Sequence, residues 1–269
     1  MSSNGHSTRA LLVTLIRMGL GLWFLFAIFP PVLLVLIILL PWRMARVRFT
    51  NHVGTLMGWT IMRISGCPIT IEGREHFDGS QPVICIGNHT SITDAFTSVW
   101  MVPTGTVGVA KKRILNYPVY GQIWYLSGHM VIDRSNTEKA KESLRKMAVM
   151  LREHGLSILL WPEGTRSRDG RLQQFKKGFA HLAIETGHPI VPMVTTGALN
   201  VWQRGHIHLR KVPIHIKFLP PIETKHWKVE TVNEHTAEVR QIIADALPKD
   251  QKPPDEAQAP IPFKVAAVG

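Results

Sequence analysis

The sequence predicts an α/β fold, with a mixed, largely parallel sheet flanked by helices and an N-terminal hydrophobic helical segment that anchors the chain to a membrane. Short apolar runs alternate with helix-like segments, as strands joined by helical crossovers do. Residues 138–154 repeat apolar side chains at helical spacing, and residues 18–42 carry no charge. We expect the anchor over residues 1–48, one globular domain over residues 49–248 and a disordered tail over residues 249–269.

The uncharged N-terminal stretch predicts a membrane segment, because its 25 residues would reach about 37 Å as one helix, enough to span a bilayer. The adjacent prolines Pro30 and Pro31 remove two backbone donors and clash with the preceding turn, so we expect a break there. The expected arrangement is a two-helix hairpin that dips into one leaflet, with a kinked single span as the alternative. A signal peptide is disfavoured, because the apolar run is too long and no small-residue cleavage site follows it.

Basic charge dominates the composition, since Lys and Arg outnumber Asp and Glu by 31 to 19 and give a formal charge of +12. This excess suits nucleic acid, an anionic membrane surface or phosphate-bearing substrates. Arg43, Arg46 and Arg48 follow the apolar stretch, which favours the cytoplasmic side and anionic headgroups. We therefore expect the protein at the cytoplasmic face of the inner or plasma membrane, in contact with anionic lipids. Nucleic acid is not an expected partner, because few aromatic residues lie among the cations.

The first half of the globular region begins with an amphipathic helix over residues 50–66, expected between the membrane and the domain. Polar or helix-like segments then separate six strand-like runs. In order these are "PITIEG", "PVICIGN", "TVGVAKK", "GHMVIDR", "SILLWPEG" and "HPIVPMVTTG". Cys85, inside the second run, is expected in the core rather than as a nucleophile.

The clearest helix signal covers residues 138–154, where Ser135 and Glu138 form a capping box and a glycine stops the pattern. A second helix is expected over residues 177–186. Two later strands, "GHIHLR" and "IHIKFLP", precede a helix around residues 231–247. From residue 249 onward the chain is polar and rich in proline, which is typical of disorder.

A histidine and an aspartate lie five positions apart where the second strand gives way to a helix. If His89 sits in the turn before the helix and Asp94 lies one turn inside it, the carboxylate can reach back to the imidazole. Such a bond fixes the imidazole tautomer and leaves the other nitrogen to take a proton from a hydroxyl. The alternative is structural, because Ser91 and Asp94 also have the spacing of a helix cap. The eight residues "GNHTSITD" alone leave both readings open.

A second cluster of polar residues follows two later strands. Arg134 ends "GHMVIDR", and Glu163, Gly164, Thr165 and Arg166 follow "SILLWP". Strand ends on one edge of an open sheet converge on the ligand crevice, where two arginines could bind the oxygens of a phosphate. For Arg134 alone, pairing with a neighbouring acidic residue is the simpler interpretation.

Two more cations, Lys176 and Lys177, directly precede the helix expected over residues 177–186. The amide groups at a helix N-terminus also favour anions, so these lysines add to the basic character of the same region.

Four blocks across residues 84–193 together resemble the glycerolipid acyltransferases typified by 1-acyl-sn-glycerol-3-phosphate acyltransferase. They are "NHTSITD", "GHMVIDR", "WPEGTRS" and "IVPM". A His-x4-Asp pair alone occurs by chance in many chains, but Pro-Glu-Gly-Thr-Arg downstream of it makes the resemblance specific. The chain departs from the family pattern at Met130 and Val131, where aromatic residues are common, and at Trp161, where Phe is usual. The resemblance implies a glycerolipid acyltransferase-like fold for the domain.

The resemblance also implies the chemistry. His89 is then the general base that deprotonates the acceptor hydroxyl, and Asp94 supports the imidazolium. The freed oxygen attacks the thioester of acyl-CoA or acyl-carrier protein without an acyl-enzyme. The implied acceptor is the sn-2 hydroxyl of lysophosphatidic acid, which would become phosphatidic acid, and no metal or other cofactor is implied.

The implied acceptor-phosphate site comprises Arg134, Glu163, Gly164, Thr165 and Arg166. Within it, Glu163 is expected to order the turn rather than to touch an anion.

The implied donor-binding cations are Lys111 and Lys112, with Lys176 and Lys177 as further candidates. All four could attract the phosphates of an acyl donor.

Several alternatives remain open from sequence. The same blocks could serve glycerol-3-phosphate or another lysolipid, such as a lyso-ornithine lipid, and a non-catalytic membrane lipid-binding module would not need His89. Zinc binding by His206, His208 and His215 is disfavoured, because these residues alternate with apolar ones as the outer face of strands does. A serine hydrolase is disfavoured, because Gly-x-Ser-x-Gly is absent.

Overall fold

A computed structural model of the chain describes residues 3–133, 135–202 and 209–253. Its centre is a seven-stranded sheet with strand order β1-β7-β6-β2-β5-β3-β4. All neighbouring strands are parallel except β6 and β7, so the predicted mixed, largely parallel sheet is confirmed. The strands are β1 (Ile69–Glu72), β2 (Ile84–Gly87), β3 (Thr106–Lys111), β4 (Met130–Ile132), β5 (Ser157–Leu160), β6 (Ile190–Thr196) and β7 (Ile214–Phe218).

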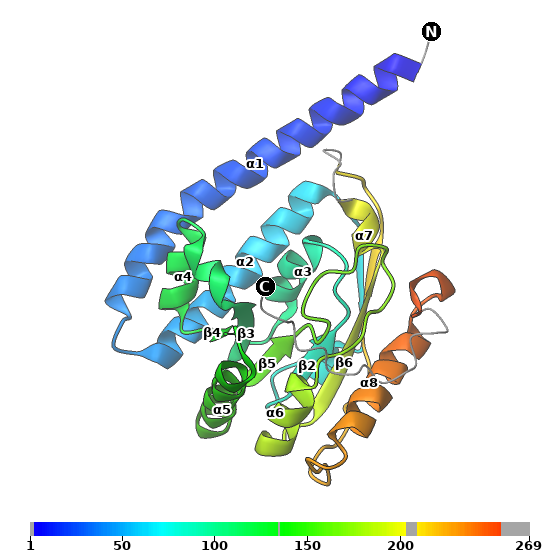
Figure 1. The fold of residues 1–269 in the computed structure, drawn as a ribbon. Helices are drawn as coiled ribbons and strands as arrows, with labels where there is room; N and C mark the ends of the chain where they lie inside the picture. Colours follow the sequence, from blue (N-terminus) through cyan, green and yellow to red (C-terminus); the bar gives the residue numbers. More distant parts are fainter. Residues whose placement is uncertain (1–2, 134, 203–208, 254–269) are drawn as a thin grey trace, which may run out of the picture.

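Helices cover both faces of this sheet (Figure 1). On one face lie α5 (Thr137–His154), α6 (Gly178–Thr186) and α8 (Val232–Ala246), and on the other lie α2 (Arg43–Ser65) and α3 (Thr93–Met101). The remaining helices are α4 (Tyr120–Ser127), α7 (Ala198–Val201) and the 3-10 turns η1 (Arg74–Phe77), η2 (Lys112–Asn116) and η3 (Lys249–Gln251).

The alternation of side chains along the central strands produces two hydrophobic cores. Ile84 and Ile86 of β2 face the core under α5, α6 and α8, whereas Cys85 between them faces the core under α2 and α3. All three side chains are fully buried. Strands buried on both faces read as continuous apolar runs, and β2 does so because it lies at the centre of the sheet. Cys85 is therefore a core residue, as expected.

The first helix differs from the prediction. Residues Ser3–Ile38 form one unbroken helix, α1, that continues through Pro30 and Pro31. The turn of the hairpin lies instead at residues 39–42, and α2 begins at Arg43 rather than at residue 50. The predicted domain boundary at residue 48 therefore falls inside a helix. The two prolines remove two N–H donors, but the residues around them keep their own helical hydrogen bonds. A backbone in lipid has no other hydrogen-bond partners, so an apolar helix of this kind stays helical.

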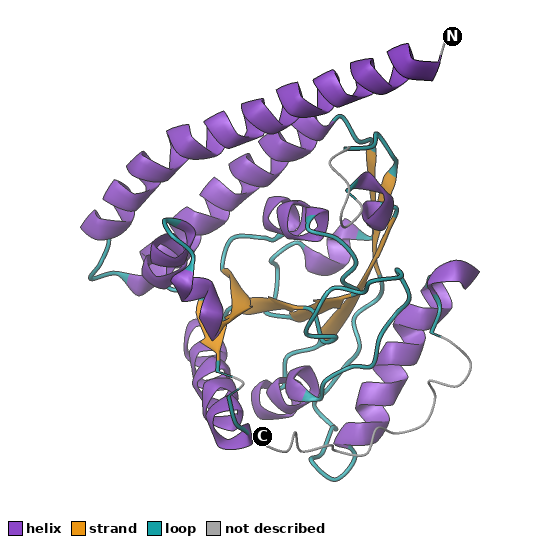
Figure 2. Ribbon diagram, turned by 45° about the horizontal axis from the view of Figure 1, so that its top comes forward, coloured by secondary structure: helices purple, strands orange, loops and turns teal. Residues whose placement is uncertain are grey.

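The two N-terminal helices run antiparallel and side by side (Figures 1 and 2). Arg17, in the first half of α1, lies against Gly66 at the end of α2, because a Cβ built on this glycine would be 2.9 Å from Arg17 Nη2. Within α1, Leu11–Ile38 is long and apolar enough to cross a membrane by length and composition, and most of it is exposed. The predicted apolar helical segment is thus present, in the form of a hairpin with a different turn.

Two smaller predictions also differ from the structure, and a third falls largely on residues that the structure does not describe. The cap of α5 is Asn136, whose Oδ1 accepts a hydrogen bond of 2.8 Å from Lys139 N–H, rather than Ser135. The strand predicted at "GHIHLR" lies largely outside the described residues, and Arg210 is not in a strand. The chain is still ordered beyond residue 249, because η3 is tied to the domain by a bond from Leu172 N–H to Gln251 C=O.

Candidate functional site

His89 is the second residue after β2, at the carboxyl edge of the sheet. Asn88 fixes this point by extending the pairing of β2 with β6. Its side-chain amide donates to Thr195 C=O and accepts from Thr195 N–H, both at 2.8 Å. The strand end is therefore rigid, and the histidine side chain leaves it in a defined direction.

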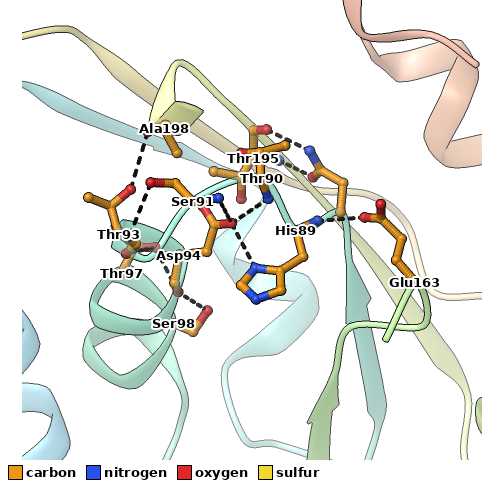
Figure 3. A network of polar contacts seen from close by, with 11 residues as sticks. His89, Thr90, Ser91, Thr93, Asp94, Thr97, Ser98, Glu163, Thr195 and Ala198 are labelled. Carbon is orange, nitrogen blue, oxygen red and sulfur yellow. Dashed lines mark hydrogen bonds and ion pairs between the residues drawn. The ribbon is translucent and has the colours of Figure 1, made fainter. Parts of the chain in front are cut away.

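Asp94 lies in the first turn of α3 and is almost fully buried. Its Oδ2 is 2.9 Å from His89 Nδ1 and also accepts the backbone N–H groups of Thr90 at 2.7 Å and Ser91 at 2.8 Å (Figure 3). This carboxylate therefore both orders the turn that leads into α3 and holds the imidazole. Because Oδ2 is an acceptor, it favours the tautomer with the proton on Nδ1, and Nε2 then carries the lone pair. Among the described residues, no hydrogen bond engages Nε2.

The turn after β5 holds the backbone of His89 from both sides. Glu163 Oε1 accepts the His89 N–H at 2.6 Å, and Ser167 N–H donates to His89 C=O at 2.7 Å. Gly164 makes this tight turn possible, because its φ of 73° is unfavourable for residues with a Cβ. The third block of the sequence therefore positions the histidine of the first block.

Glu163 is buried, and both of its carboxylate oxygens accept backbone hydrogen bonds. The second oxygen accepts Gln173 N–H at 3.2 Å. Burial raises the pKa of Glu163 to about 7, against the opposing effect of the two N–H donors. A carboxylate engaged in this way orders the turn. Its place among the acceptor-phosphate residues stays a prediction, with the role of ordering the turn that the sequence suggested.

A contact that sequence reasoning missed involves Trp161. Its indole stacks on the His89 imidazole, with ring centroids 4.4 Å apart and an interplanar angle of 16°. The sequence marked this position only as a departure from the usual Phe. Nothing in the sequence indicated that its ring meets a residue 72 positions earlier, because that contact depends on the pairing of β2 with β5.

The other predicted residues are distributed around this centre. Thr165 and Arg166 are exposed on the turn between Glu163 and Ser167, both of which bond the His89 backbone. Arg134 lies outside the described residues. The structure thus brings the third block to the histidine and leaves the position of the second-block arginine undescribed.

The four lysines predicted to bind the acyl donor lie on two separate segments of the chain. Lys176 and Lys177 are exposed just before α6, and Lys176 N–H bonds Pro162 C=O at 2.9 Å, so this loop returns to the turn after β5. Lys111 ends β3 and is exposed. Lys112 Nζ is 3.0 Å from Asp133 Oδ2, and this bond holds the Asp133 pKa below its ordinary value.

Metal binding has no support in the part of the chain that the structure describes, where no group of three His, Cys, Asp or Glu side chains could hold an ion. His215 is exposed on β7 between buried neighbours, in the outward position that the alternation predicted. His206 and His208 lie outside the described residues.

Comparison with known proteins places this geometry in a family. A family model described as Acyltransferase matches residues 68–196, from just before β1 to the end of β6. The 1-acyl-sn-glycerol-3-phosphate acyltransferase of Limnanthes douglasii is 44% identical over 220 residues, which cover 82% of this chain and 78% of the relative. This chain belongs to the acyltransferase family. The Escherichia coli enzyme of the same name is 34% identical over 176 residues, which cover 65% of this chain and 71% of the relative.

The acyltransferase fold extends to solved structures. The crystal structure of the 1-acyl-sn-glycerophosphate (LPA) acyltransferase PlsC from Thermotoga maritima superposes with a TM-score of 0.70, covering 89% of this chain and 95% of that chain. At 22% identity this likeness concerns the fold.

Proposed function

We propose that this acyltransferase moves a fatty acyl chain from acyl-CoA or acyl-carrier protein to the sn-2 hydroxyl of lysophosphatidic acid, giving phosphatidic acid. The observation that carries the proposal is the His89–Asp94 bond of 2.9 Å at the end of β2, which leaves Nε2 as the basic nitrogen. The names of the relatives, all 1-acyl-sn-glycerol-3-phosphate acyltransferases, support the choice of acceptor.

In the proposed reaction, His89 Nε2 takes the proton from the acceptor hydroxyl as its oxygen attacks the thioester carbonyl. Asp94 stabilises the imidazolium through Nδ1 while the tetrahedral intermediate forms. The intermediate then expels the thiolate, which receives the proton from His89 Nε2. The carbon–sulfur bond is thus exchanged for a carbon–oxygen bond, and the histidine returns to its starting state.

The acceptor phosphate is proposed to bind at the turn of Gly164, Thr165 and Arg166. These residues lie between two that bond the His89 backbone, so an anion held there would sit beside the base. A guanidinium can bind two phosphate oxygens at once. Arg134 remains proposed as the second arginine on the strength of the family pattern.

The donor's phosphates are proposed to meet Lys111, Lys176 and Lys177, which are exposed at the carboxyl ends of β3 and before α6. Lys112, whose ammonium pairs with Asp133, is a further candidate.

The anchor is proposed to lie in one leaflet at the cytoplasmic face. α1 is apolar on nearly all sides and exposed, so it belongs in lipid, yet it packs along α2 beside the catalytic domain. Because α1 is packed against α2 over this length, it could cross the bilayer only if α2 crossed with it. We therefore retain the division into an N-terminal anchor and a catalytic domain, with α2 shared between them.

The test is product analysis with the purified full chain in mixed micelles. Lysophosphatidic acid, glycerol-3-phosphate and a lyso-ornithine lipid are each supplied with labelled acyl-CoA or acyl-carrier protein. We expect phosphatidic acid as the main product, and the faster carrier identifies the donor. Product only with lyso-ornithine lipid would replace the acceptor, and no product with any pair would favour a non-catalytic lipid-binding module.

A further inference from the structure

A large cavity lies away from the catalytic pair. It has a volume of about 960 Å³ and lies along β4, between α4 and α5, with the first turn of α2 as a further wall. Neither His89 nor Asp94 lines it. The proposed reaction therefore does not account for it.

Two arginines of α2 form the fixed part of its lining. Arg43 donates to Gly128 C=O from Nε at 3.3 Å and from Nη2 at 3.1 Å, and Arg46 Nη1 donates to Leu126 C=O. Each guanidinium has five N–H donors, so these bonds orient the group and leave donors over. The Nε of Arg46 is buried and has no partner among the described residues.

The charge of this lining is not balanced. Five Lys and Arg side chains line it against three carboxylates, of which Asp133 pairs with Lys112, Glu142 pairs with Lys146 and Glu153 is the third. Within the described part of the chain, Arg43, Arg46 and Arg145 make no ion pair. Burial and the neighbouring Arg46 both lower the pKa of Arg43. The first turn of α2 also contains no acidic residue, so the helix dipole opposes the two arginines. A bound anion would pair with these arginines and would offset their burial, their mutual repulsion and the unfavourable helix dipole.

One side of the cavity is apolar and faces the anchor. Leu40, in the turn that follows α1, and Tyr125 of α4 both line it and are exposed, Tyr125 by 72%. Trp42 in the same turn is 60% exposed, and indole and phenol rings favour the level of lipid headgroups. The arginines therefore lie just beyond the end of a helix suited to acyl chains, at the depth where phosphates are found.

We propose that this cavity binds the phosphate headgroup of an anionic membrane phospholipid, with Arg43, Arg46 and Arg145 on the phosphate and Leu40 and Tyr125 against the glycerol and acyl chains. The lipid would join α2, α4 and α5. It is a bound membrane component distinct from the acceptor, and the proposal does not depend on acyl transfer.

Thiol protection tests the site directly in the full chain, because the native Cys67 and Cys85 are buried. Val149 lines the cavity and is exposed, so Val149→Cys supplies a reactive thiol there, and Val229→Cys supplies an exposed thiol elsewhere. Phosphatidylglycerol is added to non-ionic micelles at a concentration well above its dissociation constant for the cavity. We then expect the alkylation rate of the thiol at position 149 to fall about fivefold or more. Phosphatidylcholine, inorganic phosphate and CoA should change it less than about twofold, and alkylation at 229 should not respond.

A charge series then locates the anion. In the Val149→Cys background, Arg145→Gln should remove most of the protection, Arg145→Lys should keep it, and Lys139→Gln, on the same helix but outside the cavity, should leave it intact. Equal alkylation rates in phosphatidylglycerol and phosphatidylcholine micelles would overturn the proposal. Protection by CoA equal to that by phosphatidylglycerol would also overturn it, by assigning the cavity to the acyl donor. Because no outcome depends on turnover, failure here is separate from failure of the acyl-transfer proposal.

Discussion

Three sets of contacts hold His89, and each restricts a different motion or state of the residue. Asp94 fixes the tautomer through Nδ1, Trp161 covers one ring face, and the turn after β5 binds the backbone N–H and C=O. A base oriented in this way loses little entropy when it meets the acceptor hydroxyl. The proposed chemistry therefore rests on positioning as much as on the identity of the two catalytic residues.

Trp161 should matter for the protonated state of His89. An aromatic face stabilises an adjacent cation, which favours the imidazolium formed during transfer by about 0.5–2 kcal/mol. We expect Trp161→Leu to lower kcat by about 2- to 30-fold. Trp161→Phe should keep most of the activity, because its ring can still stack. A kcat for Trp161→Leu that matches wild type would show that the indole only fills space.

Glu163 should make stability depend on pH. Its pKa rises from 4.5 in the unfolded chain to about 7, so the folded state binds this proton more tightly. Its contribution is then greatest below pH 4.5 and is lost as pH rises through 7, by at most about 3 kcal/mol. Glu163→Gln cannot ionise, and its unfolding free energy should fall less between pH 5 and 8 than that of wild type. Parallel pH curves for the two proteins would contradict this assignment.

At this scale the sequence predicted short-range relations and missed long-range ones. The contact of Asp94 with His89 follows from a strand, a turn and a helix start within six residues. The bond from His89 to Glu163 joins residues 74 positions apart and requires that β2 and β5 be neighbours. Without strand order, the sequence indicated that Glu163 orders its own turn but not that it bonds the backbone of His89.

Among the elements, α3 carries Asp94 and depends on close packing against α2. Gly58 of α2 lies directly on α3. A Cβ built there would approach Trp100 Cβ to 2.7 Å and would also clash with Phe96 C=O. The spacing of these two helices therefore requires a glycine, and it fixes where α3 presents its first turn.

Gly58→Ala should consequently disturb both stability and activity. Overpacking of this kind costs about 1–3 kcal/mol, and α3 can relieve it only by moving Asp94. We expect a lower denaturation midpoint and a reduced kcat for lysophosphatidic acid acylation. Gly19→Ala in α1 is the matched control, because a Cβ there meets nothing within 4 Å. If both variants behave alike, the close packing of α2 on α3 is not limiting.

Element type was predictable where periodicity was strong, and element ends were not. The strands and α5, α6 and α8 were anticipated from their apolar patterns. The prolines of α1 were expected to break it, because proline rules describe helices in water, whereas the exposed apolar surface of α1 indicates lipid, where an unbonded backbone is costlier. The N-cap of α5 lies one residue later than predicted, because Asn136 is as good an N-cap residue as Ser135.

For the whole molecule, the position of α1 decides how the enzyme meets the bilayer. The helix lies along α2 from Arg17 onward, and its N-terminal turns extend beyond the end of α2 (Figure 1). In the proposed arrangement the apolar surface of α1 enters one leaflet, and the carboxyl edge of the sheet receives a lipid acceptor and a water-soluble donor.

Sidedness of labelling distinguishes this arrangement from a span. In oriented proteoliposomes, a membrane-impermeant thiol reagent should reach Ser7→Cys, before the apolar stretch, and Ser135→Cys, on the domain surface, from the same side. The buried native cysteines keep the background low. Labelling of the two positions from opposite sides would show that α1 crosses the bilayer.

The most direct measurement of the central claim is the turnover of lysophosphatidic acid by matched histidine variants. Loss of a general base lowers kcat by about 10²–10⁴-fold, so we expect His89→Ala to fall in this range, with Asp94→Asn also strongly reduced. His215→Ala, an exposed histidine on β7, should retain wild-type turnover. If His89→Ala formed phosphatidic acid at the rate of His215→Ala, the imidazole would not be the base, and the account of this site would be wrong.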